Sequence, residues 1–288
     1  MSVSAALVMK LRKRTGAGIM ECKRFLIAAD GDIELAIVEM RKAGQAKADK
    51  KSNRIAAEGL VQIACNRHIG ILGEFNVETD FSAQNVAFVE FTKYVVDSAL
   101  KNNASDIQQL LSIDPEIEHM RQQLIIKIGE NVQLRRMVNM TNDTGVIGAY
   151  LHGGRIGVLV SLIGDNEKLA KDIAMHIAAS RPLVINRDQV SAEIIAKERE
   201  IYTAQARESG KPADVMEKMI DGCLNKFLDG ISLLDQVYVK NTSLKIHQLL
   251  LENQATIVEF VCFEVGEGIT KKIDNFVDEV MSQVREQL

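Results

Sequence analysis

Leu60-Val61-Gln62-Ile63-Ala64, a short turn and Ile69-Gly70-Ile71-Leu72 are the part of this 288-residue sequence from which its architecture follows. Two short apolar runs around a turn are typical of a β-hairpin, and helically spaced apolar residues further on predict a helix. The same order returns at Val146-Ile147-Gly148-Ala149-Tyr150, at Ile156-Gly157-Val158-Leu159 and in a helical stretch over residues 167–180. The repeat predicts an α+β fold whose core has two related hairpin-plus-helix subdomains.

The two copies differ in the connection from hairpin to helix. From the turn glycine to the asparagine at the helix start there are 15 residues in the first copy (Gly70 to Asn85) and 9 in the second (Gly157 to Asn166). The extra residues fall around Glu78-Thr79-Asp80-Phe81. An insertion that the repeated unit does not need is a candidate functional segment.

Within this insertion an acid stands next to an aromatic residue, Asp80 beside Phe81, after the strand that ends the run from Ile69 to Phe75. Two interpretations stay open at this point. The pair forms an exposed wedge for a partner, or Phe81 folds back into the core, where large aromatic rings are usually buried.

The first 54 residues have the pattern of a small three-helix module. Helices are expected from Ser4 to Arg14, from Ile19 to Ala29, and from Asp32, as the cap, to Gly44. The basic connector Lys47–Arg54 is expected to be a solvated linker. This segment holds 12 Lys and Arg against 6 Asp and Glu, a net charge of +6, whereas the remaining residues carry −10 and the whole chain −4. The basic module indicates an acidic protein or nucleic acid as partner, and the absence of Trp with only 5% aromatic residues disfavours nucleic acid.

The second half predicts two further units. Apolar periodicity predicts helices over Ser191–Glu208 and Ala213–Leu228, joined by a break at residues 209–212. This antiparallel hairpin is inserted into the second copy, because the strand Val258–Val265 follows it, and it either self-associates or packs on the body. A final helix is expected over Asp274–Leu288. The predicted domains are residues 1–54, 55–140, 141–186 with 229–265, the hairpin 187–228, and 266–288.

Between the copies the pattern predicts a helix at Ile117–Leu124 and a return segment at Gly129–Arg136. Arg135 and Arg136 are candidates for a phosphate clamp, although paired arginines are more often ordinary surface residues.

The residues contain no convincing reaction centre. There is no phosphate-binding Gly-x-x-x-x-Gly-Lys-Ser/Thr, and Gly266-Glu267-Gly268 lacks the third glycine of a dinucleotide fingerprint. The cysteines are isolated, which predicts neither a metal site nor a disulfide framework. Of the five histidines, only His152 stands at a turn where a functional loop is expected. No apolar run approaches the roughly 20 residues of a membrane span and no signal peptide is evident, so a cytoplasmic protein without metal or cofactor is expected.

A family resemblance rests on short segments that occur in order along nearly the whole chain: Leu11–Lys23, Gly31-Asp32-Ile33-Glu34, Ala56-Ala57-Glu58-Gly59, Asn76–Phe81, Ile128-Gly129-Glu130-Asn131, His152–Gly157 and Phe263–Gly268. Each match is modest, but together they are specific. The chain resembles the bacterial elongation factor Ts family.

The resemblance implies a guanine-nucleotide exchange factor that binds elongation factor Tu in its GDP-bound and nucleotide-free forms and performs no covalent chemistry. It implies a ubiquitin-associated-like N-terminal module, a two-subdomain core, a dimerisation hairpin at 187–228 and a C-terminal helical module. It also implies that Thr79-Asp80-Phe81-Ser82 intrudes beside the partner's Mg²⁺ site, although Ser82 replaces the family's usual valine and Val77 its usual cysteine. The resemblance assigns partner contacts to Arg12, Ile19, Met20, His152 and Gly153.

Two other classes of protein are alternatives. An RNA-binding translation protein would use the basic segment 41–54 and lose affinity steeply with salt. An enzyme acting on a nucleotide would show turnover by the purified chain alone. Neither alternative accounts for the inserted segment.

Overall fold

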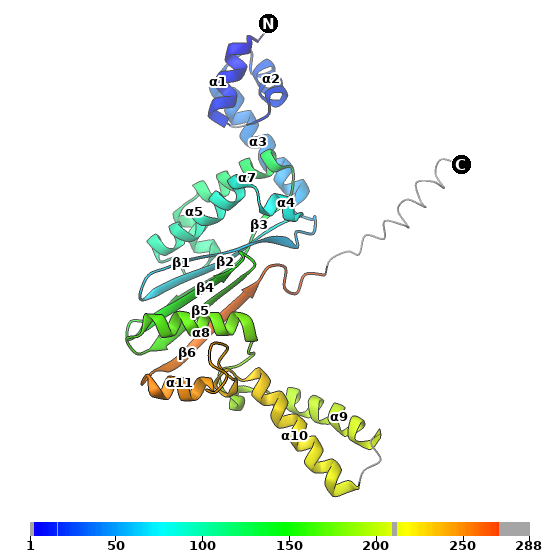
Figure 1. Ribbon diagram of the computed structural model, residues 1–288. Helices are drawn as coiled ribbons and strands as arrows, with labels where there is room; N and C mark the ends of the chain where they lie inside the picture. Colours follow the sequence, from blue (N-terminus) through cyan, green and yellow to red (C-terminus); the bar gives the residue numbers. More distant parts are fainter. Residues whose placement is uncertain (1–2, 16, 209–211, 271–288) are drawn as a thin grey trace, which may run out of the picture.

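The computed structural model describes residues 3–15, 17–208 and 212–270, and Figure 1 shows their arrangement as an elongated chain of units. The final helix predicted over Asp274–Leu288, and with it most of the unit 266–288, lies outside the described residues, as does residue 16. The break predicted at residues 209–212 lies largely outside them as well.

The N-terminal module consists of α1 (Ala5–Thr15), α2 (Ile19–Ala28) and α3 (Ile33–Lys51). Ser4 caps α1, because its Oγ accepts a hydrogen bond from the Leu7 N–H at 3.3 Å. Asp32 caps α3 as predicted, accepting from the N–H groups of Glu34 and Leu35 at 2.8 and 3.1 Å. Apolar residues spaced along the three helices meet in one buried cluster: Val8, Leu11, Ala17, Cys22, Leu26, Ala29, Ala36 and Met40.

The predicted end of the third helix at Gly44 is wrong, because α3 continues to Lys51. The segment Lys47–Arg54, predicted as a solvated linker, is therefore helical as far as Lys51, and residues 52–54 after it are exposed. One glycine inside a helix costs only about 1 kcal/mol, and the following Gln, Ala and Lys residues favour helix. Part of α3 also contacts α7 (Glu116–Ile128), which supplies tertiary support.

Two antiparallel three-stranded sheets form the core and confirm the α+β class. The first has the order β1 (Glu58–Cys65), β2 (Ile69–Val77), β3 (Val132–Thr141), and the second has the order β4 (Val146–His152), β5 (Ile156–Ile163), β6 (Thr256–Glu264). The predicted return segment after Gly129 is thus the third strand of the first sheet.

The sheets pack against each other through residues from both: Val61, Leu72, Met140, Ile147, Leu159, Phe263 and Val265. The turn glycine of each copy permits this approach. A Cβ on Gly70 would lie 2.8 Å from Cγ2 of Ile147, and one on Gly157 would lie 2.5 Å from Cγ1 of Val61. Each sheet therefore presses a side chain against the repeated glycine of the other.

Helices cover the two outer faces of the paired sheets (Figure 1). The first sheet carries α5 (Val86–Asn102), α6 (Ile107–Ile113) and α7, and the second carries α8 (Glu167–Ser180) and α11 (Ile246–Glu252). The seven-residue helices α6 and α11 were not predicted, because they are too short to show a clear apolar period.

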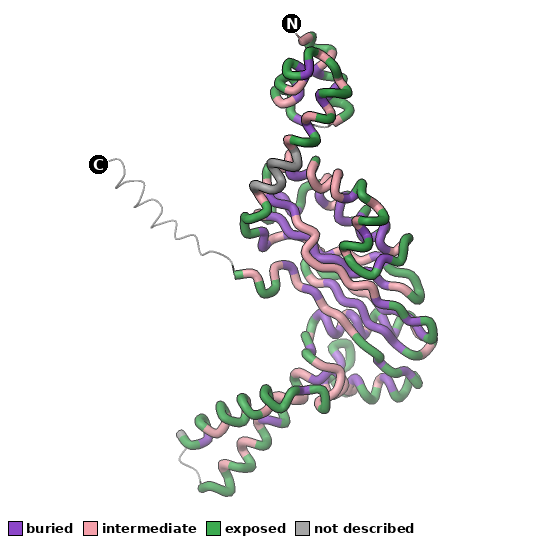
Figure 2. The backbone as a smooth tube through the Cα atoms, turned by 180° about the vertical axis from the view of Figure 1, so that it is seen from behind, coloured by how far each residue is buried: buried purple, intermediate pink, exposed green. Residues whose placement is uncertain are grey.

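The helices α9 (Ala192–Glu208) and α10 (Ala213–Ile231) lie side by side and project from the second subdomain (Figure 1), close to the predicted bounds. An ion pair between Arg199 and Asp221, 2.5 Å apart, joins them. At their base Arg187 binds Asp229 at 2.6 Å and Asp235 at 3.0 Å. Figure 2 shows that much of their surface is exposed. None of the helices in the described ranges is both long and apolar enough to cross a membrane.

Candidate functional site

The inserted segment forms α4 (Asp80–Ala83), a helix of one turn between β2 and α5. Thr79 is its N-cap and accepts a hydrogen bond from the Ser82 N–H at 3.3 Å, while Asp80 accepts one from the Phe81 N–H at 2.9 Å. The side of α4 formed by Ser82 and Ala83 is buried. The short helix is therefore seated on the first subdomain by one side.

Phe81 lies on the opposite side of α4 and is 85% exposed, the most exposed large apolar residue among those described. The interpretation that Phe81 folds into the core is wrong. Its turn of helix is seated through Ser82 and Ala83, which directs the ring away from the protein. Val86, at the start of α5, is also largely exposed.

A turn at residues 129–131 holds the segment that carries Phe81. The Glu130 carboxylate accepts hydrogen bonds from the Thr79 N–H at 3.1 Å and from the Thr79 hydroxyl at 2.8 Å. The N–H of the buried Asn131 donates to the Glu78 carboxylate at 2.7 Å. Gly129 permits this turn with φ +86°. Sequence analysis assigned no functional role to Glu130, and only the family resemblance included its segment.

The same turn binds the connection from the N-terminal module. The Lys51 ammonium donates to the Gly129 carbonyl, and the Asn131 amide donates to the carbonyls of Ser52 at 3.3 Å and Arg54 at 2.9 Å. These bonds fix the end of α3 next to the insertion.

His152 and Gly153 lie at the end of β4 and in the turn after it, and both are exposed. The His152 ring stacks on Tyr150 with 6.2 Å between ring centroids. The next residue in the turn, Gly154, accepts a hydrogen bond from the Val61 N–H at 2.8 Å, so the turn lies against β1. Glu58 at the start of β1 pairs with Val77, directly before the insertion. The structure therefore brings the His152 turn and α4 to the same end of β1.

The predicted contact residues of the N-terminal module lie elsewhere. Arg12 on α1 and Ile19 and Met20 on α2 are all exposed, Met20 at 75%. They lie on the outer module beyond α3, apart from the insertion (Figure 1). Ser82, also predicted as a site residue, is buried under α4, and the other predicted residues form two separate exposed areas and not one pocket.

Arg135 and Arg136 do not form an open phosphate clamp. Both guanidinium groups bind the fully buried Glu74 carboxylate, at 2.8 and 2.6 Å, and Glu74 also accepts from the Gly266 N–H at 2.8 Å. Burial alone would raise the pKa of Glu74, but the hydrogen bonds from Gly266, Arg135 and Arg136 outweigh it, so the pKa is lowered. Sequence reasoning missed this cluster, whose acid stands inside an apolar strand.

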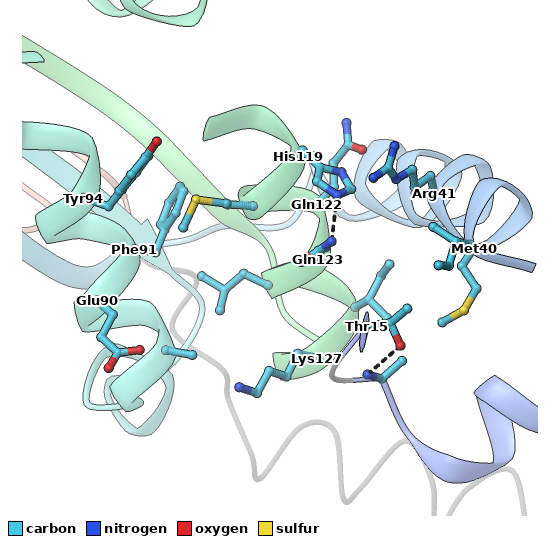
Figure 3. Close-up of a pocket in the computed structure, with 16 residues that line it drawn as sticks. Thr15, Met40, Arg41, Glu90, Phe91, Tyr94, His119, Gln122, Gln123 and Lys127 are labelled. Carbon is cyan, nitrogen blue, oxygen red and sulfur yellow. Dashed lines mark hydrogen bonds between the residues drawn. The ribbon is translucent and has the colours of Figure 1, made fainter. Parts of the chain in front are cut away.

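A groove of about 440 Å³ opens between the N-terminal module and the helices α5 and α7 (Figure 3). The side chains of His119 and Gln123 are hydrogen-bonded at 2.7 Å on one of its walls. None of the predicted site residues lines the groove. We therefore place the candidate site on the exposed surfaces around Phe81 and His152 and not in this groove.

Comparison of the sequence with known proteins identifies relatives of this chain. The family model described as "Elongation factor TS" matches residues 78–267, from the acid before α4 to the turn after β6. The chain belongs to the elongation factor Ts family. It is 58% identical over 290 residues to elongation factor Ts of Legionella pneumophila (strain Paris), and 49% identical over 288 residues to that of Francisella tularensis subsp. novicida (strain U112). Each alignment covers 99% of both chains.

Membership of the elongation factor Ts family confirms the resemblance inferred from the sequence segments. It gives the protein a role in protein biosynthesis, as a translation elongation factor.

Proposed function

We propose that this chain binds elongation factor Tu and accelerates its release of GDP by inserting Phe81 and Asp80 beside the Mg²⁺ and phosphate site of the partner. GTP then rebinds to the emptied site. The observation that carries the proposal is the 85% exposure of Phe81 on a helix whose other side is buried. Aromatic side chains are enriched at protein–protein interfaces, so an exposed phenylalanine on a seated turn of helix suits contact with a partner. Membership of the elongation factor Ts family supports elongation factor Tu as that partner.

The mechanism needs only displacement of partner groups. Mg²⁺ requires near-octahedral oxygen ligands at about 2.0–2.1 Å, so a small shift of the elements around it weakens binding sharply. The Phe81 ring pushes between partner helices, while the Asp80 carboxylate disturbs the hydrogen bonds around the ion. Ser82, where the family has valine, is buried at the base of α4, which supports a role in seating the turn that carries Asp80 and Phe81.

Further contacts keep the wedge in place. His152 and Gly153, at the same end of β1, push against a second partner element near the phosphates. Arg12, Ile19 and Met20 on the outer module supply binding energy away from the nucleotide, together with the C-terminal module. The exposure of these residues and their separation into two areas support a partner that contacts the chain at more than one place.

Linkage makes the effect reciprocal. The factor by which this chain weakens GDP binding equals the factor by which GDP weakens binding of the chain, and each tenfold corresponds to about 1.4 kcal/mol. The chain changes no covalent bond in this scheme and is an exchange factor rather than an enzyme in the covalent sense.

The projecting hairpin 187–228 is proposed as a site of self-association. Ile194 and Ile201 on α9 and Val215 on α10 are 39%, 41% and 41% exposed, which leaves apolar surface for a second copy. The boundaries 1–54, 55–140, 141–186 with 229–265, and 266–288 are proposed for the other units, with a ubiquitin-associated-like fold for the first.

Release of fluorescent GDP from elongation factor Tu in Mg²⁺ buffer tests the proposal, with the intact chain, Phe81→Ala and Leu251→Ala compared. Leu251 on α11 is a matched control, because it is 79% exposed and remote from the first sheet. We expect strong acceleration by the intact chain and by Leu251→Ala, and loss of acceleration but not of partner binding with Phe81→Ala. Equal acceleration by all three would remove Phe81 from the mechanism, and none by the intact chain would refute the proposed function.

A further inference from the structure

We propose that Glu130 is a positioning residue for nucleotide exchange, because it orients the Thr79 hydroxyl that caps the helix presenting Phe81. This inference rests on the proposed function and deepens it. Glu130 does not contact the nucleotide site of the partner in this scheme, and it acts only through Thr79.

The hydrogen bonds around Thr79 form a directed chain. A threonine hydroxyl has one proton to donate and two lone pairs to accept. Glu130 Oε1 takes the proton at 2.8 Å, which leaves a lone pair of Thr79 Oγ1 free to accept from the Ser82 N–H at 3.3 Å. Glu130 Oε2 takes the Thr79 N–H at 3.1 Å. The carboxylate thus fixes both the backbone and the hydroxyl direction of the capping residue.

The helix that depends on this cap has little other support. α4 has four residues, and a single turn is unstable by itself in water. Its remaining anchor is the buried side formed by Ser82 and Ala83, because Phe81 points outward and contacts no covering layer. Misplacing a reacting group by about 1 Å can cost up to 10²-fold in rate, so a frayed α4 would weaken the action of Phe81.

The turn that carries Glu130 is held in place by hydrogen bonds on two sides. The neighbouring Asn131 is 1% exposed and bonds both Glu78 and the carbonyl of Arg54, and the Gly129 carbonyl accepts from Lys51. The turn is therefore attached to the insertion on one side and to the end of α3 on the other. Movement of the connection from the N-terminal module would reach Thr79 through this turn.

The test measures GDP release from elongation factor Tu as a function of factor concentration for Glu130→Gln, Thr79→Val, Thr79→Ser and the double variant Thr79→Val/Glu130→Gln. Glutamine replaces one of the two accepting carboxylate oxygens of Glu130 with an NH₂ donor, and valine has no hydroxyl. We expect Glu130→Gln and Thr79→Val to lower the saturating rate roughly tenfold, with the half-saturating concentration changed less than about twofold. Thr79→Ser keeps the hydroxyl and should restore most of the rate that Thr79→Val loses.

The double variant and a cap control separate positioning from general stability. We expect the double variant to be slower than Thr79→Val alone but faster than the product of the two single effects, because both changes remove the bond to the Thr79 hydroxyl and only Glu130→Gln also weakens the bond to the Thr79 N–H. Asn166→Ala removes the cap of α8 in the second subdomain, where Asn166 accepts from the Leu169 N–H at 2.9 Å. It should lower the unfolding temperature and leave the saturating rate unchanged.

The inference would be overturned by a Glu130→Gln variant with an unchanged saturating rate, by one that changes only the half-saturating concentration, or by effects of Glu130→Gln and Thr79→Val that multiply in the double variant. If Glu130→Gln does not fold, the contrast between Thr79→Val and Thr79→Ser decides, since equal rates would refute a role for the hydroxyl. Failure of the unmodified chain to accelerate release would instead refute the proposed function itself.

Discussion

The two core subdomains share a backbone plan but use it differently. Each central strand bulges at the same distance after its turn glycine, between Glu74 and Phe75 in β2 and between Ser161 and Leu162 in β5. Each bulge begins with a buried polar residue. In the second sheet the Ser161 hydroxyl needs only a hydrogen bond from the Asn142 amide at 2.9 Å, whereas in the first the Glu74 carboxylate requires two arginines. The repeat therefore conserves geometry, while the chemistry at equivalent positions has diverged.

The connections from sheet to helix show the same divergence. Both helices begin at an asparagine cap: Asn85 accepts from the Ala87 N–H at 3.0 Å, and Asn166 from the Leu169 N–H at 2.9 Å. In the second subdomain only Gly164, with φ +127°, and Asp165 separate β5 from the cap. In the first, α4 fills this connection. The insertion thus adds α4, which exposes Phe81, without changing the hairpin-plus-helix unit that carries it.

Replacing residues 78–84 with the Gly-Asp connection of the second subdomain should have the largest effect. Acceleration of GDP release is expected to fall to the spontaneous rate, because Asp80 and Phe81 are removed, while both sheets remain folded. Stopped-flow release and circular dichroism measure the two properties. A chimera that still accelerates release would show that the difference between the copies is not functional.

Glu74→Gln should have the next largest effect, through the buried charge that the second sheet lacks. Neutralising the buried Glu74 carboxylate removes its ion pairs with both arginines, although Arg136 keeps Glu267 at 2.9 Å, so a loss of about 2–4 kcal/mol in the free energy of unfolding is expected near neutral pH. Because the folded-state pKa of Glu74 is lowered, its contribution is present above the unfolded carboxyl value of about 4.3 and is lost as pH falls through the folded-state pKa.

Urea unfolding over a range of acidic pH checks this expectation. The free energy of unfolding should fall less steeply with decreasing pH in the variant than in the unmodified chain. Glu167→Gln is the control, because Glu167 pairs with Arg67 at the exposed surface and should matter by less than about 1 kcal/mol. If the free energy of unfolding of Glu74→Gln falls equally steeply with decreasing pH, the pH dependence belongs to other carboxylates.

Alanine at the two repeated glycines tests how closely the sheets approach each other. Gly157→Ala and Gly70→Ala should each lower the free energy of unfolding by about 1–3 kcal/mol, because the new Cβ atoms meet buried side chains. Gly157→Ala is expected to cost more, since its nearest atom lies at 2.5 Å and that of Gly70 at 2.8 Å.

Gly222→Ala in α10 is the matched control for these glycines, because its Cβ meets nothing within 4 Å. It should stabilise the chain by about 0.5–1 kcal/mol through helix propensity. Chemical denaturation of all three variants gives the comparison. Destabilisation by Gly222→Ala alone would contradict the packing argument.

His176→Val should have the smallest effect and would make the two subdomains more alike. Counted from the asparagine caps, His176 in α8 stands where Val95 stands in α5, and both are buried. The His176 ring accepts from the Val239 N–H at 3.3 Å and bonds Gln236 at 2.9 Å. Burial lowers the pKa of His176, against the opposing effect of Gln236, so the neutral ring is favoured.

A histidine with a lowered folded-state pKa contributes full stability above its unfolded value of about 6.5, and stability is lost as pH falls below that value toward the folded-state pKa. Urea unfolding between about pH 5 and pH 7.5 should show a slope of at most about 1.4 kcal/mol per pH unit that His176→Val removes. The exposed His247 provides the control variant His247→Gln, which should keep the slope. Retention of the slope in His176→Val would place the titrating group elsewhere.

The sequence predicted the elements whose signals are local. Alternation and helical spacing located both hairpins, the helices after them and the α9–α10 pair, and counting residues between Gly70 and Asn85 located the insertion. Gly44 misled the prediction for α3, because a single glycine is weak evidence for a helix end when the flanking residues favour helix.

The features that the sequence did not predict are contacts between residues distant in sequence. Glu130 and Thr79 are 51 positions apart, and Glu74 and Arg135 are 61 positions apart, so no local pattern joins them. The exposure of Phe81 was equally undecidable, because the spacing of apolar residues does not reveal whether another layer covers the end of the sheet. The family segments identified Asp80 and Phe81 as site residues, but not the turn that supports them.

Because α3 is one continuous helix, its length sets both the distance and the orientation of the outer module. Its 19 residues span about 28 Å at 1.5 Å each, and its far end is fixed to the turn at Gly129. Adding one residue within the helix would lengthen it by about 1.5 Å and also rotate Ile19 and Met20 by about 100° around its axis. The length of this helix in residues therefore sets the direction in which the module faces as well as its reach.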